Sequence, residues 1–204
     1  MSLRMFPYSP SMTEGASLAT AGLWDGVWRL RLDLASKFLA DGADPNFRDR
    51  DGRTLVSRAA SGIPSFLPSS MEEAPDRDAA LAAMDFLLGF CDAGIADKDG
   101  TTPLMHAARE GNFPIVERLL GRSDAKAVNK NGRTALMYAA EKGSRACVEA
   151  LLPVSDTEAR EMFGKSAADF GMRKDPGFWS ELEAERLSAE LVEASAKRVR
   201  KPSV

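Results

Sequence analysis

The side chains with the most versatile chemistry are few in this sequence and stand far apart. His106 is the only histidine, and the only cysteines are Cys91 and Cys147. A nucleophilic cysteine needs a base within hydrogen-bond reach, and a zinc site needs several Cys or His ligands at short spacings. Neither arrangement occurs, and there is no glycine-rich phosphate loop. The sequence therefore predicts no catalytic residues, no cofactor and no bound metal.

Carboxylates gather in one short acidic run formed by Glu72, Glu73, Asp76 and Asp78. Carboxylates act as general acids or bases when burial tunes their pKa values. This run follows a proline-rich stretch, so we expect exposed chain there. It is interpreted as a solvated surface, and the protein as one that is not an enzyme.

The overall composition narrows the class of partner. The net charge of −3 argues against a protein that tracks nucleic-acid phosphates, because such binding requires an excess of Lys and Arg. No apolar stretch approaches the length of a membrane span, and no apolar signal region follows the N-terminus. With two cysteines and no Asn-X-Ser/Thr site, we expect a cytoplasmic protein that binds neither nucleic acid nor membrane.

The elements that position these residues come from an internal repeat. Three segments align: DGRTLVSRAASG from Asp51, DGTTPLMHAAREG from Asp99 and NGRTALMYAAEKG from Asn131. A degenerate fourth copy, FGKSAADFG, starts at Phe163, and the glycines of the last three copies are spaced by 32 residues. A period of this length is typical of stacked helical repeats.

Each repeat is predicted to form a turn, a short helix, a tight connection and a longer helix. The Asp-Gly or Asn-Gly pair suits a turn with positive φ. Thr102 and Thr134 can cap the short helix, and Pro103 fits its first position. Paired alanines keep one side of that helix thin. The longer helices carry apolar residues at helical spacing, which predicts a stacking face made of Ile115, Val116, Leu119, Leu120, Cys147, Val148, Leu151 and Leu152.

The segments TPLMHAAREGN with IVERLLG, and TALMYAAEKGS with CVEALL, resemble the ankyrin repeat. The resemblance is densest from Asp97 to Leu152. It implies an all-α solenoid of about five stacked helix-turn-helix units whose function is to bind another protein. The sequence departs from the family where a His usually ties the turn to its neighbour. Met105 and Met137 stand there, so we expect turn bracing that is weaker or replaced.

The register extends to both ends of a single repeat domain. The N-terminal cap is predicted to have a second helix that carries Leu30, Leu34, Ala35, Phe38 and Leu39. A C-terminal amphipathic helix is expected to cover the last repeat through Phe178, Leu182, Leu187, Leu191 and Val192.

The predicted layout has one domain between two tails. The basic C-terminal tail is interpreted as solvated, with a nuclear address as the alternative. The ranges are a tail over 1–12, a domain over 13–195 with repeats at about 16–48, 49–96, 97–128, 129–160 and 161–195, and a tail over 196–204.

The second repeat contains an insertion over residues 62–78. Its prolines prevent a regular helix in the first half, although Ser70 can start a helix that continues to Leu88. The resemblance places the insertion beside the binding face, so it is either a functional element or a neutral excursion of low entropic cost. The apolar residues that it exposes are Phe66, Leu67 and Met71.

The resemblance also implies that partner contacts come from the turn tips and the exposed side of the first helices. That surface is mixed in charge, which favours polar complementarity with a partner that is neither strongly acidic nor strongly basic. His106 and Tyr138 are interpreted as packing more than as binding residues, and Trp24, Trp28 and Trp179 as core residues of the caps. The predicted contacts, insertion included, are Arg50, Asp51, Arg53, Phe66, Leu67, Met71, Lys98, Asp99, Thr101, Arg109, Glu110, Lys130, Asn131, Arg133, Glu141 and Lys142.

Three kinds of binding protein fit these expectations. An adaptor joins two proteins through separate surfaces, whereas a dedicated inhibitor of the immunity or antitoxin type blocks a partner's active site through one surface. A delivered effector is the third kind. In each case we expect a chain that is monomeric on its own, and the sequence does not choose among the three.

Overall fold

The computed structural model describes residues 16–62, 77–185 and 188, and this part of the chain forms helices and turns without any strand. The predicted all-α class is therefore confirmed. The helices are α1 (Leu18–Trp28), α2 (Leu32–Ala40), α3 (Leu55–Ala60), α4 (Arg77–Leu88), α5 (Pro103–Glu110), α6 (Phe113–Leu120), α7 (Ala135–Lys142), α8 (Arg145–Leu151) and α9 (Ala167–Gly171). A further helical segment, 176–185, follows α9.

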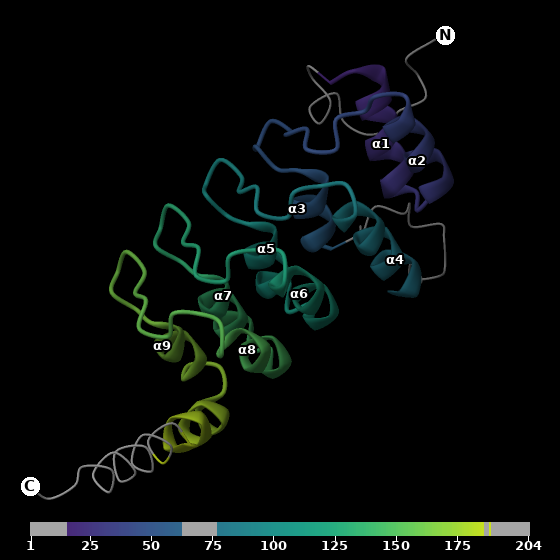
Figure 1. Ribbon diagram of the computed structural model, residues 1–204. Helices are drawn as coiled ribbons and strands as arrows, with labels where there is room; N and C mark the ends of the chain where they lie inside the picture. The colour runs from purple at the N-terminus through teal and green to yellow at the C-terminus, as the bar shows by residue number, and fades with distance from the viewer. Residues whose placement is uncertain (1–15, 63–76, 186–187, 189–204) are drawn as a thin grey trace, which may run out of the picture.

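The helices stack in two rows (Figure 1). In the inner row, α3, α5, α7 and α9 each contact the next helix, and in the outer row α4, α6 and α8 do the same. Each of α3, α5 and α7 also packs against the outer helix that follows it. The loops that join one pair to the next project side by side from the inner row (Figure 1). Packing between successive units is the arrangement of a solenoid.

The inner helices begin and end where the sequence predicts. The side chains of Thr102 and Thr134 accept the backbone N–H of Met105 and Met137, both at 3.3 Å, so the first turn of α5 and of α7 is capped. Pro103 occupies the first turn of α5, where its missing N–H costs no hydrogen bond. Both helices end at a glycine in the left-handed conformation.

The core is built from the small faces of the inner helices and the apolar faces of the outer ones. The predicted alanine pairs are almost fully buried, with exposures between 0% and 4%, so neighbouring inner helices approach closely. The predicted stacking residues of α6 and α8 are buried as well, apart from Leu120 and Leu152, which are half-buried. Burial of such side chains from water is the main force that holds the stack together.

The N-terminal cap differs from its prediction at one residue. Leu30 does not belong to the second helix, because α2 begins at Leu32 and Leu30 lies in the preceding turn with a φ of 55°. The apolar pattern misassigned it, since a left-handed residue ends one helix and cannot start the next. Trp24 is 2% exposed and makes an edge contact with Phe47, which confirms its core role.

The last repeat is covered by the helical segment 176–185. Phe178 and Trp179 are buried, and a Cβ added at Gly171 would lie 1.8 Å from Trp179 Nε1, so only glycine fits beneath the indole. The Arg145 guanidinium forms an ion pair with Asp175 and stacks over the Phe178 ring at 5.0 Å. This start of the predicted covering helix is therefore confirmed.

Several predictions fall on residues outside the described ranges. They concern the tails over 1–12 and 196–204, most of the insertion with Phe66, Leu67 and Met71, the helix start at Ser70, and the distal helix residues Leu187, Leu191 and Val192. Among the described residues, no helix is both long and apolar enough to cross a membrane.

Candidate functional site

The projecting loops are held by the side chain of their first residue. Asp97 Oδ1 accepts the backbone N–H of Asp99 and of Thr101, both at 2.9 Å. Asp49 and Asn129 make the same two bonds in the neighbouring loops. An Asp or Asn side chain that accepts hydrogen bonds from the backbone N–H groups that follow it holds the chain in a turn.

Backbone hydrogen bonds then join each loop to the next. Lys98 N–H donates to Asp51 O at 3.0 Å, Lys130 N–H to Asp99 O at 2.9 Å and Met162 N–H to Asn131 O at 2.9 Å. The histidine that usually braces this turn is thus replaced by Asp or Asn side chains and by a backbone ladder. Met105 and Met137, which stand in its place, are buried core residues.

The same Asp or Asn also bonds to the inner helix nine residues further on, and we call these contacts the turn–helix pairs. Arg58 Nε donates to Asp49 Oδ2 at 2.8 Å, His106 Nε2 lies 3.1 Å from Asp97 Oδ2, and Asn129 Nδ2 donates to the Tyr138 hydroxyl at 2.9 Å. Each pair ties a loop to its helix with a different chemistry.

The corresponding pair of the last repeat is incomplete. Its positions hold Glu161 and Phe170, and Phe170 has no polar group to offer. Glu161 is 6% exposed, and its Oε1 has no hydrogen-bond partner among the described residues. Arg133 instead covers Phe170 at 4.6 Å and Tyr138 at 5.0 Å, and so links the last two repeats by cation–π contacts.

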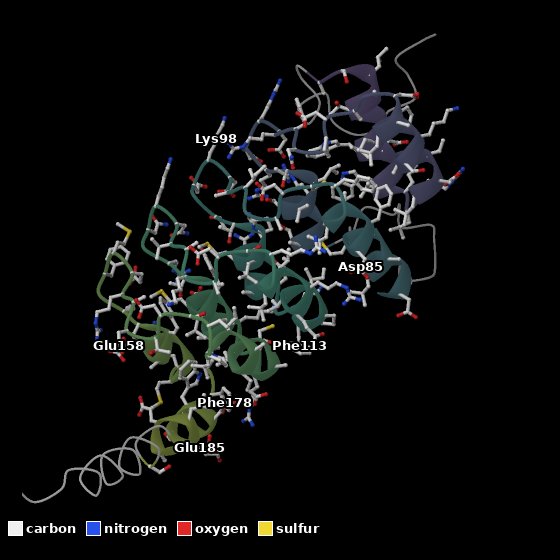
Figure 2. All side chains as sticks on the ribbon, in the orientation of Figure 1. Asp85, Lys98, Phe113, Glu158, Phe178 and Glu185 are labelled. Carbon is white, nitrogen blue, oxygen red and sulfur yellow. The ribbon has the colours of Figure 1, made fainter. Side chains whose placement is uncertain are left out.

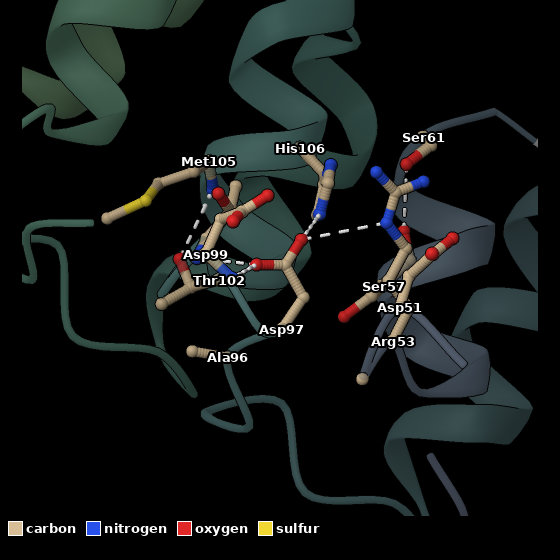
Figure 3. A network of polar contacts seen from close by, with 12 residues as sticks. Asp51, Arg53, Ser57, Ser61, Ala96, Asp97, Asp99, Thr102, Met105 and His106 are labelled. Atoms are coloured by element: carbon tan, nitrogen blue, oxygen red, sulfur yellow. Dashed lines mark hydrogen bonds and ion pairs between the residues drawn. The ribbon is translucent and has the colours of Figure 1, made fainter. Parts of the chain in front are cut away.

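The pair Asp97–His106 lies at the centre of a polar network (Figure 3). Arg109 Nη2 lies 3.1 Å from His106 Nδ1, and Arg53 Nε lies 3.6 Å from Asp97 Oδ2. A guanidinium can only donate, so Nδ1 accepts and Nε2 carries the proton given to Asp97. Both ring nitrogens of His106 are therefore satisfied by the neutral imidazole.

Burial fixes the charge states of this network. Burial of the ring, together with the cations Arg53 and Arg109, lowers the pKa of His106 to about 4 despite the adjacent Asp97. Burial alone would raise the pKa of Asp97, but the bonds from the Thr101 and Asp99 N–H groups and from His106 outweigh it and hold that pKa below its usual value. At neutral pH the pair is a carboxylate beside a neutral imidazole.

A polar pocket of about 220 Å³ opens over this network. Its walls come from three successive repeats, and its lining mixes the turn–helix pairs with exposed loop residues. The lining residues are Arg53, Asp97, Asp99, Thr101, His106, Arg109, Asn129, Lys130, Asn131 and Tyr138. We call this the central pocket.

A larger hollow of about 670 Å³ lies at the C-terminal end, where Trp179 and Leu182 face Leu136, Leu152 and neighbouring residues. Its lining is mainly apolar. It therefore offers few of the placed polar groups that fix a ligand's orientation, unlike the central pocket.

Most predicted contact residues lie on the loops and inner helices, and Figure 2 shows Lys98 near the end of a loop. Arg53 and Arg133 are half-buried, and Thr101 is buried with 6% exposure, so Thr101 presents little surface to a partner. The exposed ones are Arg50, Asp51, Lys98, Asp99, Arg109, Glu110, Lys130, Asn131, Glu141 and Lys142.

The residues that organise this surface were not predicted from the sequence. Asp49, Asp97, Asn129 and Arg58 were not among the predicted site residues, although all four lie in the aligned segments or directly before them. The signal was available, because Asp or Asn stands three residues before the turn glycine in the first three aligned copies, and Arg58, His106 or Tyr138 follows that Asp or Asn nine positions later.

The two cysteines do not form a reactive site. The Cys91 thiol donates to Pro45 O at 3.3 Å, and burial, with a contribution from Asp44, raises the pKa of Cys91 to about 12. Burial also raises the pKa of Cys147. Both thiols are therefore protonated at neutral pH, and within the described ranges no cluster of metal-ligating side chains occurs.

Comparison with known proteins agrees with this architecture. The family model described as ankyrin repeats (3 copies) matches residues 76–161, which contain α4 to α8 and the loops between them. No curated protein matches the chain. The loops, caps and helix pairs of the matched segment recur on both sides of it, and residues 76–161 of this chain consist of ankyrin repeats.

Proposed function

We propose that this protein is a binding module that holds a partner protein against the surface formed by its loops and inner helices, which we call the loop face. Ankyrin repeats are generally protein–protein interaction modules. The observation that carries the proposal is a set of exposed lysines on this face. Lys98, Lys130 and Lys142 are exposed, come from different loops or helices, and make no ion pair with the described residues.

The rigid support of the loop face favours recognition. The three loops of Asp49, Asp97 and Asn129 are each fixed by two side-chain bonds, one backbone bond to the next loop and a turn–helix pair. A surface that is already ordered loses little conformational entropy on binding, so more of the contact energy appears as affinity.

The same structure supports binding over catalysis. His106 donates one ring proton to Asp97 and accepts from Arg109, so its imidazole has no free nitrogen for a substrate. We further propose that the protein acts as a monomer in the cytoplasm, where its two thiols stay reduced. An adaptor and a dedicated inhibitor or effector remain the two ways in which such a module would act.

Site-specific photo-crosslinking in the native host tests the proposal. A photoreactive amino acid at Lys98 or at Glu141 on the loop face is expected to capture a protein. The matched controls carry it at Glu117 or Glu149, which are exposed on the outer helices α6 and α8. Capture from the outer helices alone would contradict the proposal.

The pattern of captured proteins separates the alternatives. One protein from the loop face alone indicates an inhibitor, whereas different proteins from the two faces indicate an adaptor. A parallel deletion of Ser65 to Glu73 reports on the insertion: loss of the loop-face crosslink assigns it a binding role, and an unchanged crosslink makes it a neutral excursion.

A further inference from the structure

The fold separates charges that are mixed along the sequence. The segments that contain the turn–helix pairs and the inner helices, 47–61, 96–111, 128–143 and 160–174, contain thirteen Lys and Arg against eight Asp and Glu. The rest of the described chain contains eight Lys and Arg against sixteen Asp and Glu. A chain with a net charge of −3 therefore has an excess of positive charge in these four segments.

The carboxylates of the loop face are largely engaged within the protein. Asp97 uses Oδ1 for two backbone N–H groups and Oδ2 for His106 and Arg53, so its oxygens have little capacity left. Asp51 pairs with Arg58 at 3.1 Å and Glu141 with Arg133 at 2.8 Å. Fewer free carboxylates are therefore available to a partner than the count of Asp and Glu suggests.

The cationic side chains around the central pocket have fewer partners within the protein than these carboxylates have. The buried Arg53 Nε has no hydrogen-bond partner among the described residues, and its ion pair with Asp97 is long at 3.6 Å. Lys130 makes no ion pair in the described part of the chain. Arg109 gives one Nη to His106 and approaches Glu110 only at 3.8 Å. Asp99 is the single exposed carboxylate in the lining.

The three cations come from three successive repeats and meet at one pocket. A pocket of about 220 Å³ has room for a short polar side chain with water, since each water occupies about 30 Å³ in the liquid. A carboxylate there would accept from guanidinium and ammonium donors in charge-assisted hydrogen bonds. A cationic side chain would meet three like charges and one free acceptor.

We propose that the central pocket receives an aspartate or glutamate side chain from an acidic segment of the partner protein. This inference rests on the proposed function and names the chemistry of the partner. The excess of positive charge in the segments that contain the turn–helix pairs steers the acidic segment, and Arg53, Arg109 and Lys130 fix the carboxylate. Such recognition weakens as salt rises, because the charges are partly exposed.

The single histidine provides a reporter for the test. His106 lies in the pocket wall, so its imidazole NMR signal is unique and local. The probes are a capped Gly-Glu-Gly-Glu-Gly peptide, the same peptide with Gln or with Lys in place of Glu, and a thymidine oligonucleotide. We expect a saturable, salt-sensitive shift of the His106 signal with the Glu peptide and none with the Gln or Lys peptide.

Variants assign the shift to the pocket. The double substitution R53Q with K130Q is expected to weaken binding of the Glu peptide about three- to tenfold, the loss of one or two partly exposed charge contacts. The exposed Lys37→Gln on α2, away from the loop face, should leave it unchanged. K130Q alone, at an exposed site, keeps the test valid if R53Q disturbs folding.

Three outcomes would overturn the inference: no shift with the Glu peptide, equal shifts with the Glu and Gln peptides, or stronger pocket-dependent binding of the oligonucleotide. If the peptide test fails while crosslinking from Lys98 succeeds, only the proposal that the partner supplies an acidic segment is refuted. If the Glu peptide binds but no protein is captured on the loop face, the proposed function is refuted. The pocket would still be shown to bind carboxylates.

Discussion

At the scale of single residues, Asp97 joins a loop to its inner helix, although it was not among the predicted contact residues. Its carboxylate holds a loop through two backbone N–H groups and a helix through His106, while it is almost fully buried. Replacement of Asp97 leaves these donors without an acceptor, and each unsatisfied buried donor costs free energy.

We therefore expect Asp97→Ala to lower the free energy of unfolding by about 2 to 4 kcal/mol. Asp97→Asn should cost clearly less, because an amide oxygen still accepts the loop N–H groups, as Asn129 does in the next repeat. Urea unfolding followed by circular dichroism measures both. Equal losses for the two variants would show that the charge of Asp97, and not its loop bonds, matters.

His106 makes stability depend on pH. Its folded pKa of about 4 lies below the ordinary value of 6.5, so between these values the unfolded chain binds more protons. The contribution of His106 to stability is therefore constant above about pH 6.5 and declines as the pH falls toward 4, by roughly 1 kcal/mol per pH unit over this window. The depressed pKa of Asp97 acts in the same sense only at still lower pH.

The control for this pH dependence is His106→Gln, which cannot titrate. Chemical denaturation between pH 4 and 7 is expected to give a sloping stability for the natural chain and a much flatter one for the variant. A slope that survives in His106→Gln would assign the pH dependence to carboxylates elsewhere.

At the scale of helices and loops, much of the fold follows from local sequence patterns, but the turn–helix pairs that support the loop face do not. The caps at Thr102 and Thr134 and the glycines of the turns were predicted because their interactions lie within one helical turn or one loop. The turn–helix pairs were not, because a contact over nine residues depends on how the loop folds back on its helix. The misassigned Leu30 has the same origin, since its positive φ is not visible in an apolar pattern.

Glycine at the turns is required to different degrees. Gly52 has a φ of 78°, and an added Cβ would lie 2.9 Å from the Lys98 backbone N, which belongs to the next loop. Gly42 has a φ of 87° but open space around its Cα, and Gly121 has neither constraint. Substitution at these three sites separates conformational strain from contact between loops.

We expect Gly121→Ala to be nearly neutral and Gly42→Ala to cost about 1 kcal/mol from the left-handed conformation alone. Gly52→Ala should cost more, because the Lys98–Asp51 backbone bond must also shift. Thermal unfolding of the three variants gives the order. A Gly52→Ala variant as stable as Gly42→Ala would mean that the loops separate at little cost.

At the scale of the whole molecule, contacts between successive units make the stability of the ends partly independent of the centre. The last repeat depends on Trp179, which is 6% exposed and fills the space above Gly171. Loss of this indole removes the cover of α9 but touches neither α3 nor α5.

For Trp179→Ala we expect a loss of about 3 to 5 kcal/mol that is confined to the C-terminal end, as for other buried aromatic side chains. Hydrogen exchange should show lost protection in α9 and retained protection in α5. Phe163→Ala is the control, because Phe163 is 77% exposed on a loop. A uniform loss of protection along the chain would show instead that the whole stack unfolds as one unit.

The turn–helix pairs also bear on how such a chain can change over generations. Asp49 matches Arg58, Asp97 matches His106 and Asn129 matches Tyr138, so each repeat holds a matched set of its own. A recombination that joins two repeats after the outer helix transfers the set whole. A crossover inside the turn that paired Asn129 with Arg58 would place an amide N–H against a guanidinium N–H, two donors without an acceptor, so gene exchange should be tolerated better at the boundaries between repeats than within them.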